Sequence, residues 1–234
     1  MKNYVPKFKT LTFLSVIFIF TFLFFNFSNA QLSPRFIVSW KAQNYAPVWY
    51  GGKVLPVVGT LVDINFELID AGKIANLSQN TIRWYVNYDL VKNESDGLGI
   101  KLLRTTVPNR GGDEMSVRIV IIDYANNVLN KIITIPVVRP EAVIDSPYLN
   151  NNIRSGLSVF RAIPLFFNVS GVNKMAVNWS ANDVKSSGAG GNPWQLDLNL
   201  TNPQSGTKIN IGVSVKNVLN YLELASQSII LETK

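Results

Sequence analysis

Apolar and polar residues alternate with a period of two in several stretches of this chain, and this pattern limits it to β-structure. The clearest stretches are residues 62–68, 82–89, 196–200 and 209–216. A period of two over such lengths is typical of strands with one buried face. A helical period of 3.6 does not appear after residue 30. We therefore predict an all-β fold built from short strands.

Two stretches near the end of each half are predicted to form long β-hairpins. Residues 115–138 hold an apolar strand, the turn cluster Asp123–Asn127 and a second strand. Residues 207–231 follow the same plan. Asp and Asn populate turns readily, so they mark where each chain reversal lies. A further strand is predicted over residues 57–68.

The order of these elements repeats along the chain. Trp84 and Trp179 each lie in a middle strand, and the tetrapeptide Asn-Val-Leu-Asn at 127–130 recurs at 217–220. Pro140 suits a short linker because proline cannot donate to a strand ladder. We therefore predict two tandem immunoglobulin-like β-sandwich domains, residues 31–139 and 140–234. Each tryptophan is predicted to fill a core rather than to stack on a ligand.

This pattern resembles the bacterial immunoglobulin-like and PKD-like domains of cell-surface proteins. The resemblance rests on Trp84, Trp179 and the two closing hairpins, and it covers nearly all of residues 35–232. The cysteine pair of antibody domains is absent, and Trp84 is followed by Tyr-Val-Asn where the PKD motif has Asp-Phe-Gly. The resemblance implies a structural or binding role.

The N-terminus has the layout of a targeting segment. Lys2, Lys7 and Lys9 precede an apolar run from Leu11 to Phe25, and small residues at Ser28–Ala30 suit a cleavage site. We predict a signal peptide over residues 1–30. The alternative is an uncleaved hydrophobic anchor helix over residues 10–29, which would hold the protein in a membrane. Both readings predict an exported protein whose remaining residues lie outside the cell.

The chain has no Cys and no His, and this excludes several chemistries. Ser-His-Asp and Cys-His nucleophile systems, Cys/His zinc sites and disulfides all need residues that are missing. Paired carboxylates remain as a catalytic option, but no spacing singles out Asp89 with Asp96 or Asp113 with Asp123. We predict that the protein is not an enzyme and holds no cofactor.

Charge and loop composition argue against two further classes of ligand. The formal net charge is +7, about +4 without the leader, and no run of Lys or Arg occurs, so we predict no nucleic-acid binding. The oxygen-rich segments 93–97 and 111–114 match no calcium-loop spacing. They are predicted to be polar turns, and no metal site is predicted.

One loop is a candidate contact site. Residues 45–53 contain Tyr45, Trp49 and Tyr50 together with two glycines, and aromatic loops on a rigid sandwich can grip sugars, peptides or proteins. The alternative is that Trp49 and Tyr50 cap the open end of a core. The glycine-rich loop 186–194 is predicted to be flexible, with Trp194 tucked back onto the sandwich.

These observations predict a non-enzymatic structural or adhesion module at the cell surface or outside the cell. Its partner would be a protein or a glycan at that surface. A carbohydrate-binding surface protein is one alternative, and a membrane-anchored subunit of an envelope or secretion complex is another. The step from fold to role is an analogy between folds.

Overall fold

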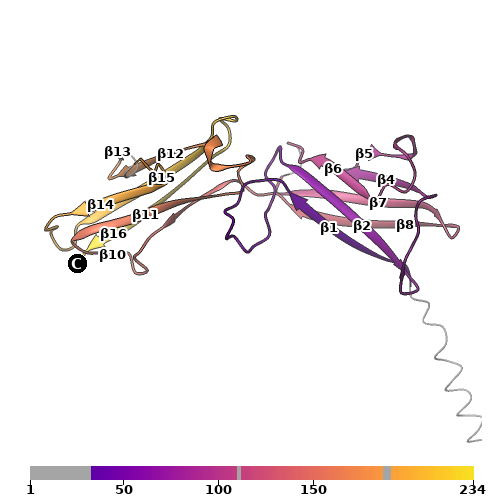
Figure 1. Cartoon of the computed structure of the whole chain (residues 1–234), viewed down its shortest axis with the longest axis horizontal. Helices are drawn as coiled ribbons and strands as arrows, with labels where there is room; N and C mark the ends of the chain where they lie inside the picture. The colour runs from indigo at the N-terminus through magenta and orange to yellow at the C-terminus, as the bar shows by residue number, and fades with distance from the viewer. Residues whose placement is uncertain (1–32, 110–111, 187–190) are drawn as a thin grey trace, which may run out of the picture. The chain divides into compact units, whose positions relative to one another are not determined.

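The computed structural model describes residues 33–109, 112–186 and 191–234. In these residues the chain is all-β, with sixteen strands and two single-turn 3-10 helices (Figure 1). The predicted all-β class is therefore confirmed. The predicted leader, residues 1–30, lies outside the described residues. Within the described ranges, no helix has the length and apolar character needed to cross a membrane.

The strands before residue 137 form two sheets. The first sheet orders its strands β1-β2-β3, and β6 pairs with β2. The second sheet has the order β5-β4-β7-β8, visible in Figure 1 as neighbouring arrows. The strand bounds are β1 Arg35–Ala42, β2 Leu61–Asp70, β3 Lys73–Ile74, β4 Thr81–Val86, β5 Asp89–Lys92, β6 Leu102–Thr106, β7 Glu114–Tyr124 and β8 Asn127–Pro136.

The strands after residue 140 form two more sheets. One has the order β14-β11-β9, and the other has the order β10-β16-β15-β12-β13. The strand bounds are β9 Glu141–Asp145, β10 Asn152–Ile153, β11 Gly156–Leu165, β12 Met175–Ala181, β13 Val184–Ser186, β14 Gln195–Leu200, β15 Lys208–Asn217 and β16 Leu224–Thr233.

Trp84 and Trp179 are buried as predicted, with 0% and 2% of their surfaces exposed. Trp84 lies edge-on to Phe66, with ring centroids 5.6 Å apart, and its Nε1–H donates to the Ile100 carbonyl at 2.9 Å. Trp179 belongs to a buried cluster drawn from residues 142–231, and its Nε1–H donates to the Pro193 carbonyl at 3.0 Å. Each ring therefore fills a core and also holds a loop in place through its Nε1–H hydrogen bond.

The same turn follows each of these tryptophan strands. Asn87 and Asn182 both have positive φ, 46° and 49°, at the reversal into the next strand. The Asn87 side-chain carbonyl accepts from the Ser116 N–H, and that of Asn182 accepts from the Asn210 N–H. Asparagine tolerates this left-handed conformation and can bond the neighbouring backbone. The same hydrogen-bond pattern therefore follows both tryptophan strands.

The outward faces of the two tryptophan strands differ. In the first, Tyr85 pairs across the ladder with Arg118, whose guanidinium lies 4.1 Å from the tyrosine ring centroid. In the second, the corresponding pair is Ser180 and Gly212. A Cβ on Gly212 would lie 2.6 Å from the Ser180 hydroxyl, so this face has no room for larger side chains as it stands.

Both predicted hairpins are present, as β7–β8 and β15–β16. The shared tetrapeptide, however, does not occupy equivalent places. Asn127 opens β8, whereas Asn217 closes β15 and the rest of its motif lies in the turn. The sequence match therefore does not mark equivalent positions in the two hairpins.

The strand predicted over residues 57–68 begins later, at Leu61. Residues 57–60 form a tight turn instead, in which the Thr60 N–H donates to the Val57 carbonyl at 3.0 Å. The Thr60 hydroxyl accepts from the Val57 N–H, and Gly59 has a φ of 83°. Glycine adopts this conformation without steric cost, which favours the turn over an extended strand.

The turn between β15 and β16 is built on a buried carboxylate. Glu223 is only 6% exposed. Its carboxylate accepts from the Asn168 backbone N–H and from the Asn217 side-chain amide, the latter at 2.7 Å. Leu219, Tyr221 and Leu222 of the same turn point into solvent. Burial of this polar side chain is tolerated here because hydrogen bonds to the protein replace those to water.

The described residues divide into two compact units, a small one of residues 33–37 and 67–76 and a larger one that holds the described residues of 38–66 and 77–234. In the described part of the small unit, β2 turns into β3 and Ile69 pairs with Ile74. The Ala75 N–H donates to the Leu68 carbonyl at 2.8 Å. This division does not test the boundary at residues 139 and 140, which stays a prediction.

The oxygen-rich segment 93–97 contains a capped 3-10 turn, Glu94–Asp96. Asp96 accepts from the Asn93 N–H at 2.9 Å, and the Asn93 side chain accepts from the Ser95 N–H. These oxygens therefore cap their own backbone. Gly111 of the other segment lies outside the described residues. The described ranges hold no cluster of three or more acidic side chains suited to a metal ion.

Glu94 also forms an ion pair whose titration can be predicted. Arg83 donates from Nε and Nη2 to its carboxylate at 2.9 and 2.7 Å, and chiefly these bonds lower the Glu94 pKa to about 2. Because the folded pKa lies below the unfolded value of 4.5, the pair's stabilisation is present above pH 4.5 and is lost as the pH falls through 2. We expect an NMR titration midpoint for Glu94 near pH 2 and a higher one in Arg83→Ala. An equal midpoint in both proteins would contradict the assignment.

Candidate functional site

The predicted contact loop is fixed at its first residues by backbone hydrogen bonds to a distant segment. Tyr45 forms an antiparallel bridge with Phe167, in which the Tyr45 N–H donates to the Phe167 carbonyl at 2.7 Å. The Phe166 N–H donates back to the Tyr45 carbonyl at 2.8 Å, and the Asn44 amide donates to the Phe166 carbonyl. The loop therefore starts from a defined position rather than from a flexible tether.

The bridge leaves a gap in the strand ladder along one edge of β11. In the described residues, β14 pairs with β11 from Gly156 to Arg161. The Ala162 N–H then donates to the Trp194 carbonyl at 2.9 Å, and the next bond on this edge is the one from Phe166 to Tyr45. By strand alternation, Pro164 faces the same edge between them. Proline has no N–H, so it leaves no unpaired donor in the gap.

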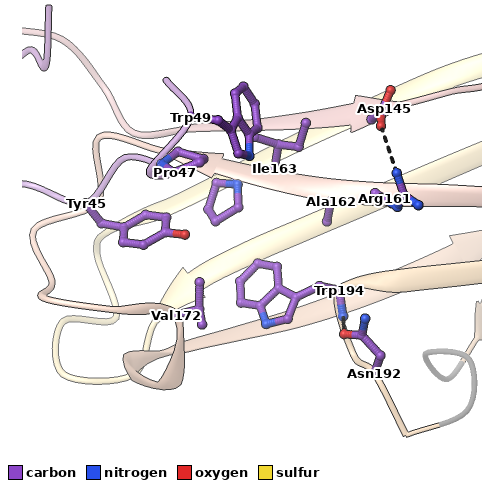
Figure 2. Close-up of a pocket in the computed structure, with 11 residues that line it drawn as sticks. Tyr45, Pro47, Trp49, Asp145, Arg161, Ala162, Ile163, Val172, Asn192 and Trp194 are labelled. Atoms are coloured by element: carbon purple, nitrogen blue, oxygen red, sulfur yellow. Dashed lines mark hydrogen bonds and ion pairs between the residues drawn. The ribbon is translucent and has the colours of Figure 1, made fainter. Parts of the chain in front are cut away.

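A pocket of about 370 Å³ lies over this gap. Figure 2 shows the Trp49 and Trp194 rings on either side of β11, with Tyr45 toward one end and Asp145 with Arg161 toward the other. Its lining is Tyr45, Pro47, Trp49, Asp145, Arg161, Ala162, Ile163, Pro164, Val172, Asn192 and Trp194. A mostly apolar hollow with a few polar groups is the usual form of a small-ligand site.

The three predicted contact residues have different places. Trp49 is 69% exposed and lines the pocket. Tyr45 also lines it, and burial raises the pKa of its phenol, so the hydroxyl remains a donor at neutral pH. Tyr50 is half-buried and lies edge-on to Phe166, with ring centroids 5.8 Å apart. Whether any of the three contacts a ligand stays a prediction.

The charged groups of the pocket come from two neighbouring strands. Asp145 on β9 and Arg161 on β11 are directly opposite each other in the ladder. Their closest approach is 4.0 Å, between Asp145 Oδ2 and Arg161 Nη1, and both side chains are more than half exposed. At this distance and exposure the pair is weak, so both groups keep hydrogen-bonding capacity for a ligand. The Asn192 side-chain carbonyl accepts from the Trp194 backbone N–H at 3.1 Å.

Trp194, Arg161, Asp145 and Asn192 are absent from the predicted contact set. Trp194 was expected to lie against the sandwich, and it does pack on the buried cluster while also lining the pocket. The sequence signal for this residue was the presence of a tryptophan, Trp194, in the glycine-rich loop 186–194. No local pattern indicates that residues 45–49 and 192–194 come together, because the Tyr45–Phe167 bridge spans more than a hundred residues.

No family model matches the chain, and the comparison with curated proteins returns no match. Among solved structures, fibronectin(III)-like modules of Clostridium thermocellum CbhA are 12% identical over 85% of this chain and 94% of theirs, with a TM-score of 0.30. The Ig1-2 module of the Drosophila receptor protein tyrosine phosphatase DLAR is 14% identical over 86% and 98%, with a TM-score of 0.26.

A third similar structure is SGBP-B of a Bacteroides ovatus mixed-linkage glucan utilization locus, solved with a mixed-linkage heptasaccharide. It is 9% identical over 86% of this chain and 47% of that protein, with a TM-score of 0.26. Scores of this size place the chain in no family, and the function has to be argued from its own residues.

Proposed function

We propose that the chain is a non-enzymatic binding module of an exported protein, and that the pocket between Trp49 and Trp194 is its contact site. The observation that carries this proposal is the exposure of Trp49, 69% of its surface, on a loop held by backbone hydrogen bonds. Large aromatic side chains on rigid supports are the residues that most often dominate binding energy.

Export is the second part of the proposal and rests on the sequence of residues 1–30. The basic start, the apolar run and the small residues at 28–30 favour a cleaved signal peptide. Two tandem sandwich domains with a boundary at residues 139 and 140 form the third part. The recurrence of the Trp84 and Asn87 hydrogen bonds at Trp179 and Asn182 supports it.

The export proposal is tested by fractionating source cells and sequencing the N-terminus of the protein. A surface or secreted chain that begins at Gln31 is the expected result. An intact N-terminus in the membrane fraction would instead favour the anchor, and with it the membrane-anchored subunit. A chain confined to the cytosol would contradict both.

The binding proposal predicts that Trp49→Ala with Trp194→Ala lowers binding of the full chain to the surface of source cells at least tenfold. Truncating a central aromatic contact typically costs 2 kcal/mol or more, and about 1.4 kcal/mol is a factor of ten. Labelled protein and flow cytometry give the measurement. Val48→Ala is the matched control, because Val48 is fully exposed on the same loop but outside the pocket lining. Equal binding by the double variant would overturn the proposal.

A further inference from the structure

The chemistry of the pocket indicates what kind of ligand it takes. Its lining includes three aromatic rings, those of Trp49, Trp194 and Tyr45. Flat aromatic faces pair with the C–H faces of a sugar ring through dispersion and burial of apolar area. The 370 Å³ volume lies within the range of small-ligand sites.

The polar groups complement hydroxyls. The carbonyl of Pro164 faces the gap by strand alternation, and Asp145 supplies carboxylate oxygens, so both accept from ligand O–H groups. Arg161, opposite Asp145 in the ladder, supplies N–H donors at the same end of the pocket. A ring with several hydroxyls can both donate and accept, and so can satisfy both kinds of group at once.

The same groups disfavour two other occupants. An extended peptide could fill the gap as an added strand only by bonding to the exposed edge of β11, and Pro164 offers it no N–H. A carboxylated ligand would be attracted by Arg161 but repelled by Asp145, because these two side chains lie opposite each other in the ladder. The local charge is thus balanced, which favours a neutral ligand.

We propose that the pocket binds a neutral sugar residue of a glycan, stacked on Trp49 and Trp194 with its hydroxyls on Asp145, Arg161 and the Pro164 carbonyl. This inference rests on the proposed binding role of the same pocket. One sugar ring on an open site implies weak binding, with a Kd on the order of 1 mM. Tight binding to cells would then come from many copies of the glycan.

The test uses the full chain in a detergent without a sugar headgroup. Methyl glucoside, methyl galactoside and methyl mannoside are titrated in turn, with glucuronic acid as the acidic probe, while ligand-observed NMR records binding. We expect a saturable change with at least one neutral glycoside. Trp49→Ala and Trp194→Ala should each weaken the affinity for that glycoside at least tenfold. Asp145→Asn should weaken binding several-fold and leave the fold intact by circular dichroism.

No saturation with any neutral glycoside, or saturation with glucuronic acid alone, would overturn the inference. The cell-binding assay separates this failure from that of the proposed function. If cell binding needs Trp49 and Trp194 but neutral glycosides neither bind nor compete, the pocket is a contact site for another ligand. If cell binding is unaffected by both substitutions, the proposed contact site itself is wrong.

Discussion

Replacing Trp84 or Trp179 with alanine is expected to lower the free energy of unfolding by about 3–5 kcal/mol. Both rings are almost fully buried, and each donates an Nε1–H bond to a loop carbonyl. Alanine leaves a cavity that the surrounding strands cannot fully close, and it also leaves that carbonyl without its donor. Chemical denaturation followed by circular dichroism measures the change.

The exposed Trp49 supplies the matched control. Trp49→Ala removes the same side chain from a surface loop and should change stability by no more than about 0.5 kcal/mol. A loss below about 1 kcal/mol in Trp84→Ala or Trp179→Ala would contradict their assignment to the core.

The same pair of variants tests the proposed two-domain organisation. Domains that unfold independently give separate transitions, so Trp84→Ala should shift one transition and Trp179→Ala the other. A single transition that both substitutions shift by equal amounts would contradict independent unfolding.

Replacing Glu223 with alanine is expected to cost about 2–4 kcal/mol. The carboxylate is buried and accepts from the Asn168 N–H and the Asn217 amide, so its removal leaves the Asn168 N–H without this acceptor and the Asn217 amide with only its 3.5 Å bond to the Asn168 carbonyl. A buried donor without a partner has lost its hydrogen bonds to water and has none to replace them, which costs free energy. Denaturant unfolding at neutral pH measures the loss.

Two variants make the Glu223 result specific. Glu223→Gln keeps the size of the side chain but offers one acceptor oxygen in place of two, so an intermediate loss is expected. Glu232→Ala, at an exposed position of β16, should have little effect. If Glu223→Gln unfolds like the unsubstituted protein, the two acceptor bonds are not what stabilises this turn.

The strands could be predicted from sequence because their signal is local. The alternation in residues 209–216 lies within β15, and that in residues 82–89 begins in β4 but runs past its end at Val86. Trp84 and Trp179 are buried as their mid-strand positions indicated. The start of β2 was missed because residues 57–60 are apolar enough to extend a strand. Gly59 and Thr60 were the available turn signals, and they decide the conformation.

The pocket could not be predicted in the same way. Its lining comes from a loop near residue 45, from β9 and β11, and from Trp194, and the first of these is joined to the rest by long-range contacts with Phe166 and Phe167. Such long-range pairing depends on backbone groups that every residue carries, so side-chain patterns do not encode it. The repeated tetrapeptide misleads because a short sequence match carries no information about strand register, and its two copies lie at different positions in the two hairpins.

The inner and outer faces of the tryptophan strands differ between the two halves to different extents. This contrast bears on how the halves diverged, if they are copies of one unit. Inward, Ile119 and Val213 stand opposite the tryptophans, a change of one methylene group. Outward, the Tyr85–Arg118 pair corresponds to Ser180 and Gly212, a change of chemical class. Amino-acid substitution would thus have been slow at inward positions, where packing constrains the side chain, and fast at outward positions, which face solvent. If the two proposed domains are copies of one unit, a comparison restricted to the inward-facing residues of their strands should detect the relationship best.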